Sequence, residues 1–116
     1  MAKKVILDTS FILSAIRNKI DFLEETRNLG LTPIIPKQVI VELKGITKSE
    51  SKLALKLIKK NKLKTIDLKT KNTDQGIINY ANKNPKITVA SLDREIKSNI
   101  KNQKLVIRAK KKLAIL

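Results

Sequence analysis

Short apolar runs alternate along the chain with segments in which apolar residues recur at helical spacing. The runs are rich in Val and Ile, which is typical of strands buried on both faces of a sheet. We predict strands at residues 3–8, 32–35, 64–68, 87–92 and 104–109, with 113–116 as a sixth, edge strand. The segments between them are predicted to be helices, at 9–18, 21–30, 36–45, 49–61, 73–84 and 93–102.

Particular residues place these helices. Gly30 is a stop signal for the second helix. Leu53, Leu57 and Ile58 are predicted to share the buried side of the helix at 49–61. Thr73 is the predicted N-cap of the next helix, whose residues 77, 78 and 81 are expected to face inward.

The alternation of strands and helices predicts an α/β fold. Strands this apolar are covered on both sides, which favours a three-layer α/β/α arrangement with a central parallel sheet of four or five strands. We find no internal repeat and no linker, so residues 1–116 are predicted to form one domain.

The charge balance points to a polyanionic partner. Lys and Arg number 26 and Asp and Glu 10, a formal net charge of +16. Nucleic acid is therefore expected ahead of an acidic membrane surface. With three aromatic residues in all, binding is expected to depend on phosphate contacts and on salt rather than on base stacking.

The residues that are missing narrow the chemistry. The chain has no Cys and no His, which excludes disulfides, thiolate metal sites and His-dependent catalytic triads. An enzyme built from this chain must use carboxylates, hydroxyls, lysines and metal. The sequence has no signal peptide and no apolar stretch of about 18 residues, so a cytoplasmic protein is expected.

Four of the acids stand where one pocket could collect them. Asp8 ends the first strand, Asp93 follows a later strand, and Asp74 opens a helix. Glu42 lies one turn after Val39, so it is expected to point partly inward. In a parallel sheet, ligands bind at the carboxyl ends of the strands where the strand order reverses. Clustered carboxylates share protons or hold cations, and oxygen-only ligands suit Mg²⁺ or Mn²⁺.

Each acid also has an ordinary structural role open to it. Asp8, Asp74 and Asp93 could cap helices or favour their N-termini, and Glu42 could pair with Lys44 or another surface lysine. These roles explain Asp74 and Asp93 well when each is taken alone. They explain Asp8 and Glu42 less well, and they do not explain the ordered set of four.

That ordered set resembles the PIN domains, a family of metal-dependent ribonucleases. The similar segments are, in order, "VILDTSFILSAI", "IPKQVIVELKGI", "TDQGIINYA" and "ITVASLDREIKSNI". The basic ending "VIRAKKKLAIL" resembles the ribosomal-RNA-processing branch and its archaeal relatives more than VapC-type toxins. Gln75 stands where many relatives in that branch carry a second Asp, a departure that concerns the number of metal ions.

The resemblance implies an endoribonuclease that uses one or two Mg²⁺ or Mn²⁺ ions. Asp8, Glu42, Asp74 and Asp93 would be the catalytic and metal-binding residues, with Asp93 acting through water or on a second ion. Thr9 and Ser91 would orient them. The residues expected to contact RNA are Lys37, Lys44, Arg94 and Lys97.

Three alternatives stay open. The first is a toxin ribonuclease with an antitoxin partner, and the second is a non-catalytic RNA-binding subunit of a ribosome-assembly complex. The third is a phospho-accepting receiver domain, which ranks low because Asp8 stands alone and Asp67 is expected within its strand rather than after it. The sequence does not decide between a monomer and a homodimer.

Overall fold

The computed structural model describes residues 3–109 and 111–116, so Lys110 of the basic ending lies outside the described residues. In this part of the chain six strands form one sheet, in the order β3-β2-β1-β4-β5-β6. The strands are β1 Lys3–Leu7, β2 Leu31–Pro36, β3 Lys64–Ile66, β4 Thr88–Ala90, β5 Lys104–Arg108 and β6 Lys112–Ile115.

The first five strands are parallel, and β6 pairs with β5 antiparallel. The predicted parallel sheet is thus confirmed at five strands, with the sixth as an antiparallel edge. The chain builds β1, β2 and β3 toward one edge and then returns to place β4 on the other side of β1. The order therefore reverses between β1 and β4, where an α/β sheet opens a crevice for ligands.

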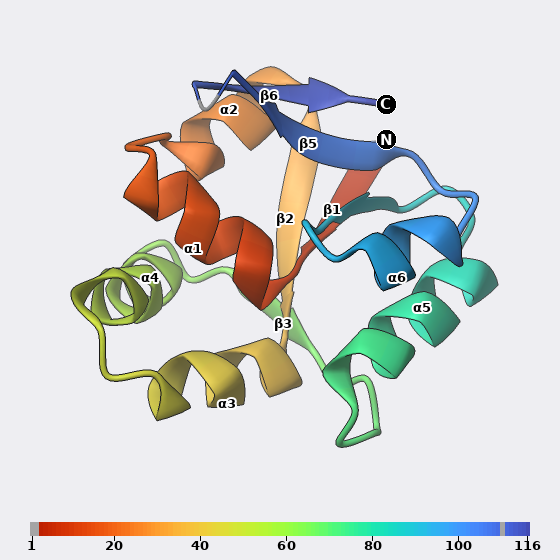
Figure 1. The fold of residues 1–116 in the computed structure, drawn as a ribbon, viewed down its shortest axis with the longest axis horizontal. Helices are drawn as coiled ribbons and strands as arrows, with labels where there is room; N and C mark the ends of the chain where they lie inside the picture. Colours follow the sequence, from red (N-terminus) through yellow and green to blue (C-terminus); the bar gives the residue numbers. More distant parts are fainter. Residues whose placement is uncertain (1–2, 110) are drawn as a thin grey trace.

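Helices cover both faces of the sheet, as Figure 1 shows. They are α1 Thr9–Arg17, α2 Phe22–Asn28, α3 Lys37–Gly45, α4 Ser49–Lys60, α5 Thr73–Lys83 and α6 Arg94–Ser98. Side chains of β1 alternate between two cores: Val5 and Leu7 pack with α1–α4, while Ile6 packs with α5 and α6. Across residues 3–109 and 111–116, no helix has the length and apolar character needed to span a membrane.

Two local predictions were wrong. In α4 the buried residues are Ser51, Ala54 and Ile58, and Leu53 is 45% exposed. Leu53 is five residues from Ile58, a rotation of about 140° around the helix, so it cannot share the same buried face. The N-cap of α5 is Asn72 rather than Thr73, because the Asn72 side chain accepts a hydrogen bond from the Gln75 backbone N–H.

A close contact fixes the start of α5, the helix that carries Asp74. Gly76 is buried, and a Cβ placed on it would lie 2.7 Å from Thr70 Cγ2 and 3.0 Å from Leu68 Cβ. The segment between β3 and α5 can therefore lie against the helix only because residue 76 has no side chain.

We expect Gly76→Ala to lower the free energy of unfolding by about 1–3 kcal/mol, because the added methyl group overpacks this contact. Urea denaturation measures the change. Gly45→Ala is the matched control. Gly45 is helical, and apart from its chain neighbours and the backbone of its own helix no heavy atom lies within 4 Å of the place that an added methyl group would take. Stability should therefore hold or rise by up to about 1 kcal/mol. Equal stability losses in the two variants would show that the contact does not constrain the helix.

Candidate functional site

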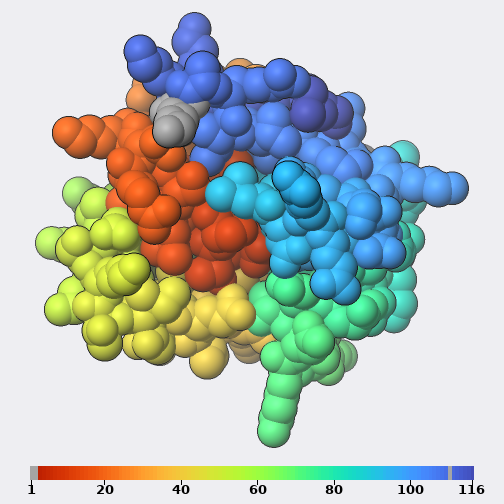
Figure 2. Space-filling view, viewed as in Figure 1, coloured from red at the N-terminus to blue at the C-terminus, as the bar shows by residue number. Residues whose placement is uncertain are grey.

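A cavity of about 540 Å³ lies at the carboxyl edge of the sheet, beside the point where the strand order reverses. It brings together all four acids singled out in the sequence. Its lining residues are Asp8, Thr9, Ser10, Glu42, Gly45, Ile46, Asp74 and Asp93. The red, gold, green and light-blue segments that carry the acids meet near the middle of the face in Figure 2.

Asp8 is the buried acid of the cavity. It follows β1 directly, and its backbone N–H continues the sheet by donating to the Ala90 carbonyl at 2.9 Å. Its side chain is 5% exposed and accepts hydrogen bonds from Ser91 Oγ at 2.9 Å and Ser10 Oγ at 3.1 Å. Although Asp8 occupies the N-cap position of α1, its carboxylate makes no capping hydrogen bond. Capping therefore does not account for this carboxylate.

Burial raises the pKa of Asp8, and the negative charge of Glu42 raises it further. The hydrogen bonds from the two serines and from the Thr9 backbone act in the opposite direction without cancelling the rise. A carboxylate in this position is costly to ionise unless a cation shares the cavity.

Glu42 differs from its prediction. It was expected to point partly inward, but its side chain is exposed on α3 at the rim of the cavity. The reason is that α3 buries Val39 and Leu43, and Glu42 falls outside that face. The structure pairs its Oε1 with the Thr9 hydroxyl, which donates to it, rather than with Lys44. Thr9 thus fixes the direction of this carboxylate.

Asp74 and Asp93 lie side by side in the cavity lining. Asp74 lies in the first turn of α5, and Asp93 caps α6 by accepting from the Glu95 N–H at 2.8 Å. The pKa of Asp74 is raised to about 6, first by burial and then by the hydrogen bond and the charge of Asp93. The charges of Asp8 and Glu42 raise it further. The other three acids therefore all act electrostatically on Asp74.

A chain of hydroxyl contacts joins the two strand ends. Ser91 Oγ donates to Asp8 and accepts from the Asp93 backbone N–H at 3.0 Å. Ser10 Oγ donates to Asp8 and accepts from the Leu92 N–H at 3.2 Å. Ser91 was predicted to orient the acids, whereas no such role was predicted for Ser10. Its spacing two residues after a strand-end Asp is the signal that could have identified it.

The donors in the cavity fit a hard divalent cation. They are carboxylate and hydroxyl oxygens, the ligand type preferred by Mg²⁺ and Mn²⁺. The raised pKa values of Asp8 and Asp74 show unrelieved negative charge that a cation would neutralise. Among the described residues, no group of three or more acidic side chains is arranged to hold a metal ion. The lining therefore fits the ion in the chemistry of its donors but does not form an assembled ligand group.

The predicted RNA-binding residues lie outside the cavity lining. Lys37 and Lys44 are exposed on α3, and Arg94 and Lys97 lie on α6 directly after Asp93, with Lys97 half-buried. The first two share α3 with Glu42, and the other two lie on α6, the helix that Asp93 precedes. All four are therefore close to an acid of the cavity in the sequence.

Asp67 corrects another prediction, because β3 ends at Ile66 and Asp67 follows the strand instead of lying within it. It nevertheless stays out of the cavity. Its Oδ1 accepts from Gln38 Nε2 at 2.9 Å and from the Lys69 N–H at 2.8 Å, and these bonds lower its pKa. Asp67 thus ties the segment after β3 to α3.

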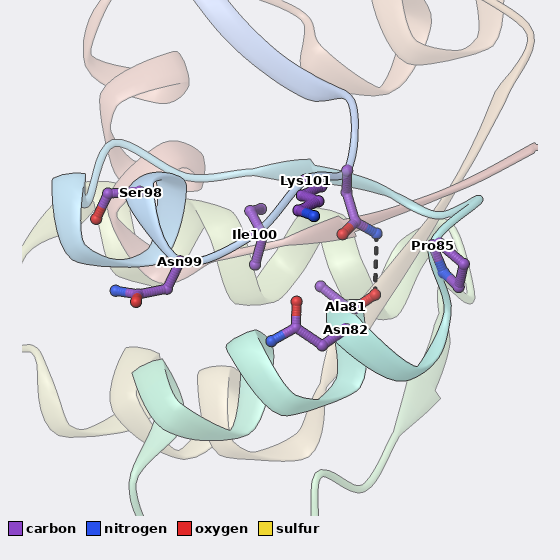
Figure 3. Close-up of a pocket in the computed structure, with 8 residues that line it drawn as sticks. Ala81, Asn82, Pro85, Ser98, Asn99, Ile100 and Lys101 are labelled. Atoms are coloured by element: carbon purple, nitrogen blue, oxygen red, sulfur yellow. Dashed lines mark hydrogen bonds between the residues drawn. The ribbon is translucent and has the colours of Figure 1, made fainter.

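A second cavity, of about 390 Å³, lies at the opposite ends of α5 and α6 (Figure 3). Its lining holds amides, apolar groups and Lys101 but, among the described residues, no acid. Asn102 is buried there and its Nδ2 is within 3.1 Å of the carbonyls of Ala81, Asn84 and Ile87. Asn102 serves to hold the end of α5 against the start of β4.

Comparison with known proteins identifies the class. Residues 5–112 match the family described as "PIN like domain", so the chain belongs to that family. The sequence is 31% identical to Ribonuclease VapC4 of Methanocaldococcus jannaschii, over 93% of this chain and 92% of that protein. The fold is similar to the solved structure of the PIN domain endonuclease Utp24, with a TM-score of 0.85 and 24% identity, covering 98% of this chain and 91% of that one. The family predicted from the four motifs is thereby confirmed.

Proposed function

We propose that this chain is an endoribonuclease that hydrolyses RNA phosphodiester bonds at the four-carboxylate cavity with the help of Mg²⁺ or Mn²⁺. One observation carries the proposal: four acids from separate segments line one cavity, and the buried one, Asp8, has no capping role there. The family and the ribonuclease name of the Methanocaldococcus relative support the same chemistry.

Asp8, Glu42 and Asp74 would hold the first ion, and Asp93 would act through water or on a second ion. A divalent ion bound there supplies an activated water and neutralises charge at the scissile phosphate. Thr9 holds Glu42 and Ser91 holds Asp8, so both hydroxyls keep carboxylates oriented toward the cavity. Lys37, Lys44, Arg94 and Lys97 are proposed to attract the RNA phosphates.

The proposed role in the cell is ribosomal RNA processing or RNA turnover. Two kinds of partner are proposed: an antitoxin if the chain is a toxin ribonuclease, or a ribosome-assembly complex if it acts on ribosomal RNA. A homodimer is compatible with either role.

The test is cleavage of labelled RNA of mixed sequence in Mg²⁺, in Mn²⁺ and in EDTA. We expect internal cuts with either ion and none in EDTA. RNA binding without cleavage in any of these conditions would contradict the proposal and favour a non-catalytic RNA-binding subunit.

A further inference from the structure

A row of lysines follows the outer face of α4. Lys48, Lys52, Lys56 and Lys59 are all exposed, and we call them the α4 lysine row. An α-helix turns about 100° per residue, so these four side chains fall within an arc of about 80°. The opposite face of the helix is buried against the core through Ala54 and its neighbours. The row therefore points into solvent as one narrow basic strip.

This arrangement is unfavourable for the helix itself. Like charges four residues apart repel each other, and Lys48 stands at the helix N-terminus, where the helix dipole disfavours a cation. α4 is described in full, and its single acid, Glu50, lies off the row and pairs with Arg17 at 3.6 Å. The row thus lacks neutralising partners within its own helix, which leaves it available to a polyanion.

The row starts beside the acid cavity. Ile46 lines the cavity, and Ser51 Oγ lies 2.6 Å from the Ile46 carbonyl and 2.7 Å from the Lys48 carbonyl. This hydroxyl fastens the first turn of α4 to the rim. From Lys48 the row extends away from the cavity for about 16 Å, at 1.5 Å per residue.

We propose that the α4 lysine row is a track for the RNA backbone, holding the strand that flanks the cleaved bond. The inference rests on the proposed function, because it assumes that the cavity is where RNA is cut. Each ammonium would contact a phosphate, and the strand would lead along α4 to the carboxylates. An anionic membrane fits less well, because a helix that lies in a membrane surface buries a broad apolar face there, and α4, which is described throughout, has Leu53 as its only exposed large apolar side chain.

The test compares two variants with the same change in charge. The first replaces three lysines of the row: Lys48→Gln, Lys52→Gln and Lys56→Gln. The control replaces three exposed lysines at the far ends of α5 and α6: Lys83→Gln, Lys86→Gln and Lys101→Gln. Fluorescence anisotropy measures binding of an RNA of about 20 nucleotides in EDTA at several salt concentrations. This length exceeds the number of nucleotides that one small domain covers. Because EDTA prevents metal-dependent cutting, the result does not depend on whether the chain is a nuclease.

We expect the row variant to bind RNA about tenfold or more weakly at low salt, with the slope of log K against log salt reduced by about 2, since each phosphate contact contributes about 0.7. The control variant should keep the parent's affinity within about threefold. In a cleavage assay with Mn²⁺, the row variant should raise KM more than it lowers kcat.

Equal losses in the two variants would overturn the proposal, because affinity would then follow net charge alone. Retained RNA binding with lost binding to vesicles containing phosphatidylserine would overturn it in favour of a membrane surface. Thermal melts check folding. If the triple variant does not fold, Lys52→Gln is compared with Lys101→Gln, and the row variant should lose about threefold in affinity while Lys101→Gln binds as the parent does. Absence of cleavage in the parent would refute the proposed function while leaving the comparison in EDTA valid.

Discussion

Asp8→Asn should lower Mn²⁺-dependent RNA cleavage by about 10²–10³-fold or more, because it removes a negative charge from the centre that binds the catalytic ion. The metal-free variant should be no less stable than the parent. Burial and the charge of Glu42 already raise the pKa of the Asp8 carboxyl, so a neutral amide relieves an unfavourable charge and can still accept from Ser91. Single-turnover cleavage and thermal melts in EDTA measure the two effects.

Asp67→Asn is the matched control for this experiment. Asp67 also follows a parallel strand at the carboxyl edge, but its carboxylate is bonded to Gln38 and Lys69 and does not line the cavity. Cleavage by this variant should stay within about twofold of the parent. If Asp8→Asn cuts RNA as well as the parent does, Asp8 has no part in the reaction.

The metal-free protein should lose stability as pH rises from about 4 to about 6. The pKa of Asp74 is about 6 in the folded protein against 3.8 for an ordinary Asp, so the folded state holds this proton more tightly than the unfolded state does. The contribution to stability is complete below the ordinary pKa and is lost as pH rises through the folded value. Asp8 contributes with the same sign.

Chemical denaturation at about pH 4.5 to 7.5, a range set by the ordinary and the folded pKa of Asp74, measures this effect. The quantity to compare is the free energy of unfolding of the parent minus that of Asp74→Asn. Taking the difference removes the pH dependence that comes from the rest of this strongly basic chain. In EDTA this difference should shrink as pH rises, because the parent loses the stability that comes from the Asp74 proton, and the variant has no such proton to lose. At pH 7, Mn²⁺ at 100 times its Kd should stabilise the parent by about 2.7 kcal/mol. If the stability difference between parent and variant does not change with pH, and Mn²⁺ does not stabilise the parent, the carboxylates do not form one site.

Much of the fold and the grouping of the acids could be predicted from local patterns. The run Val5–Leu7 is apolar because β1 lies at the centre of the sheet and is covered on both faces, so its sequence alone reveals its position. A parallel sheet brings the carboxyl ends of its strands to one edge, which explains why Asp8 and Asp93 line one cavity although they are 85 positions apart in the sequence.

Side-chain directions could not be predicted in the same way. The exposure of Glu42 depends on which neighbours α3 packs against, because Glu42 lies only one turn from the buried Val39 and helical spacing alone allows either direction. Leu53 is different, since its angular distance from Ile58 could have excluded a shared face. The capping of α5 by Asn72 depends on a one-residue choice between two adjacent polar side chains. Such choices are decided by tertiary contacts, which a single sequence does not display.

The sheet order also sets when this protein can act during its own synthesis. β4, which Ser91 and Asp93 follow, must insert beside β1, a strand that leaves the ribosome much earlier. Contacts between segments this far apart in sequence form late, because the intervening chain must be made and closed first. A growing polypeptide therefore has the first of the four acids long before the last, and the cavity cannot exist until the segment that carries Asp93 has emerged. We expect the nascent chain to be harmless to the ribosome that makes it until that segment is free to fold.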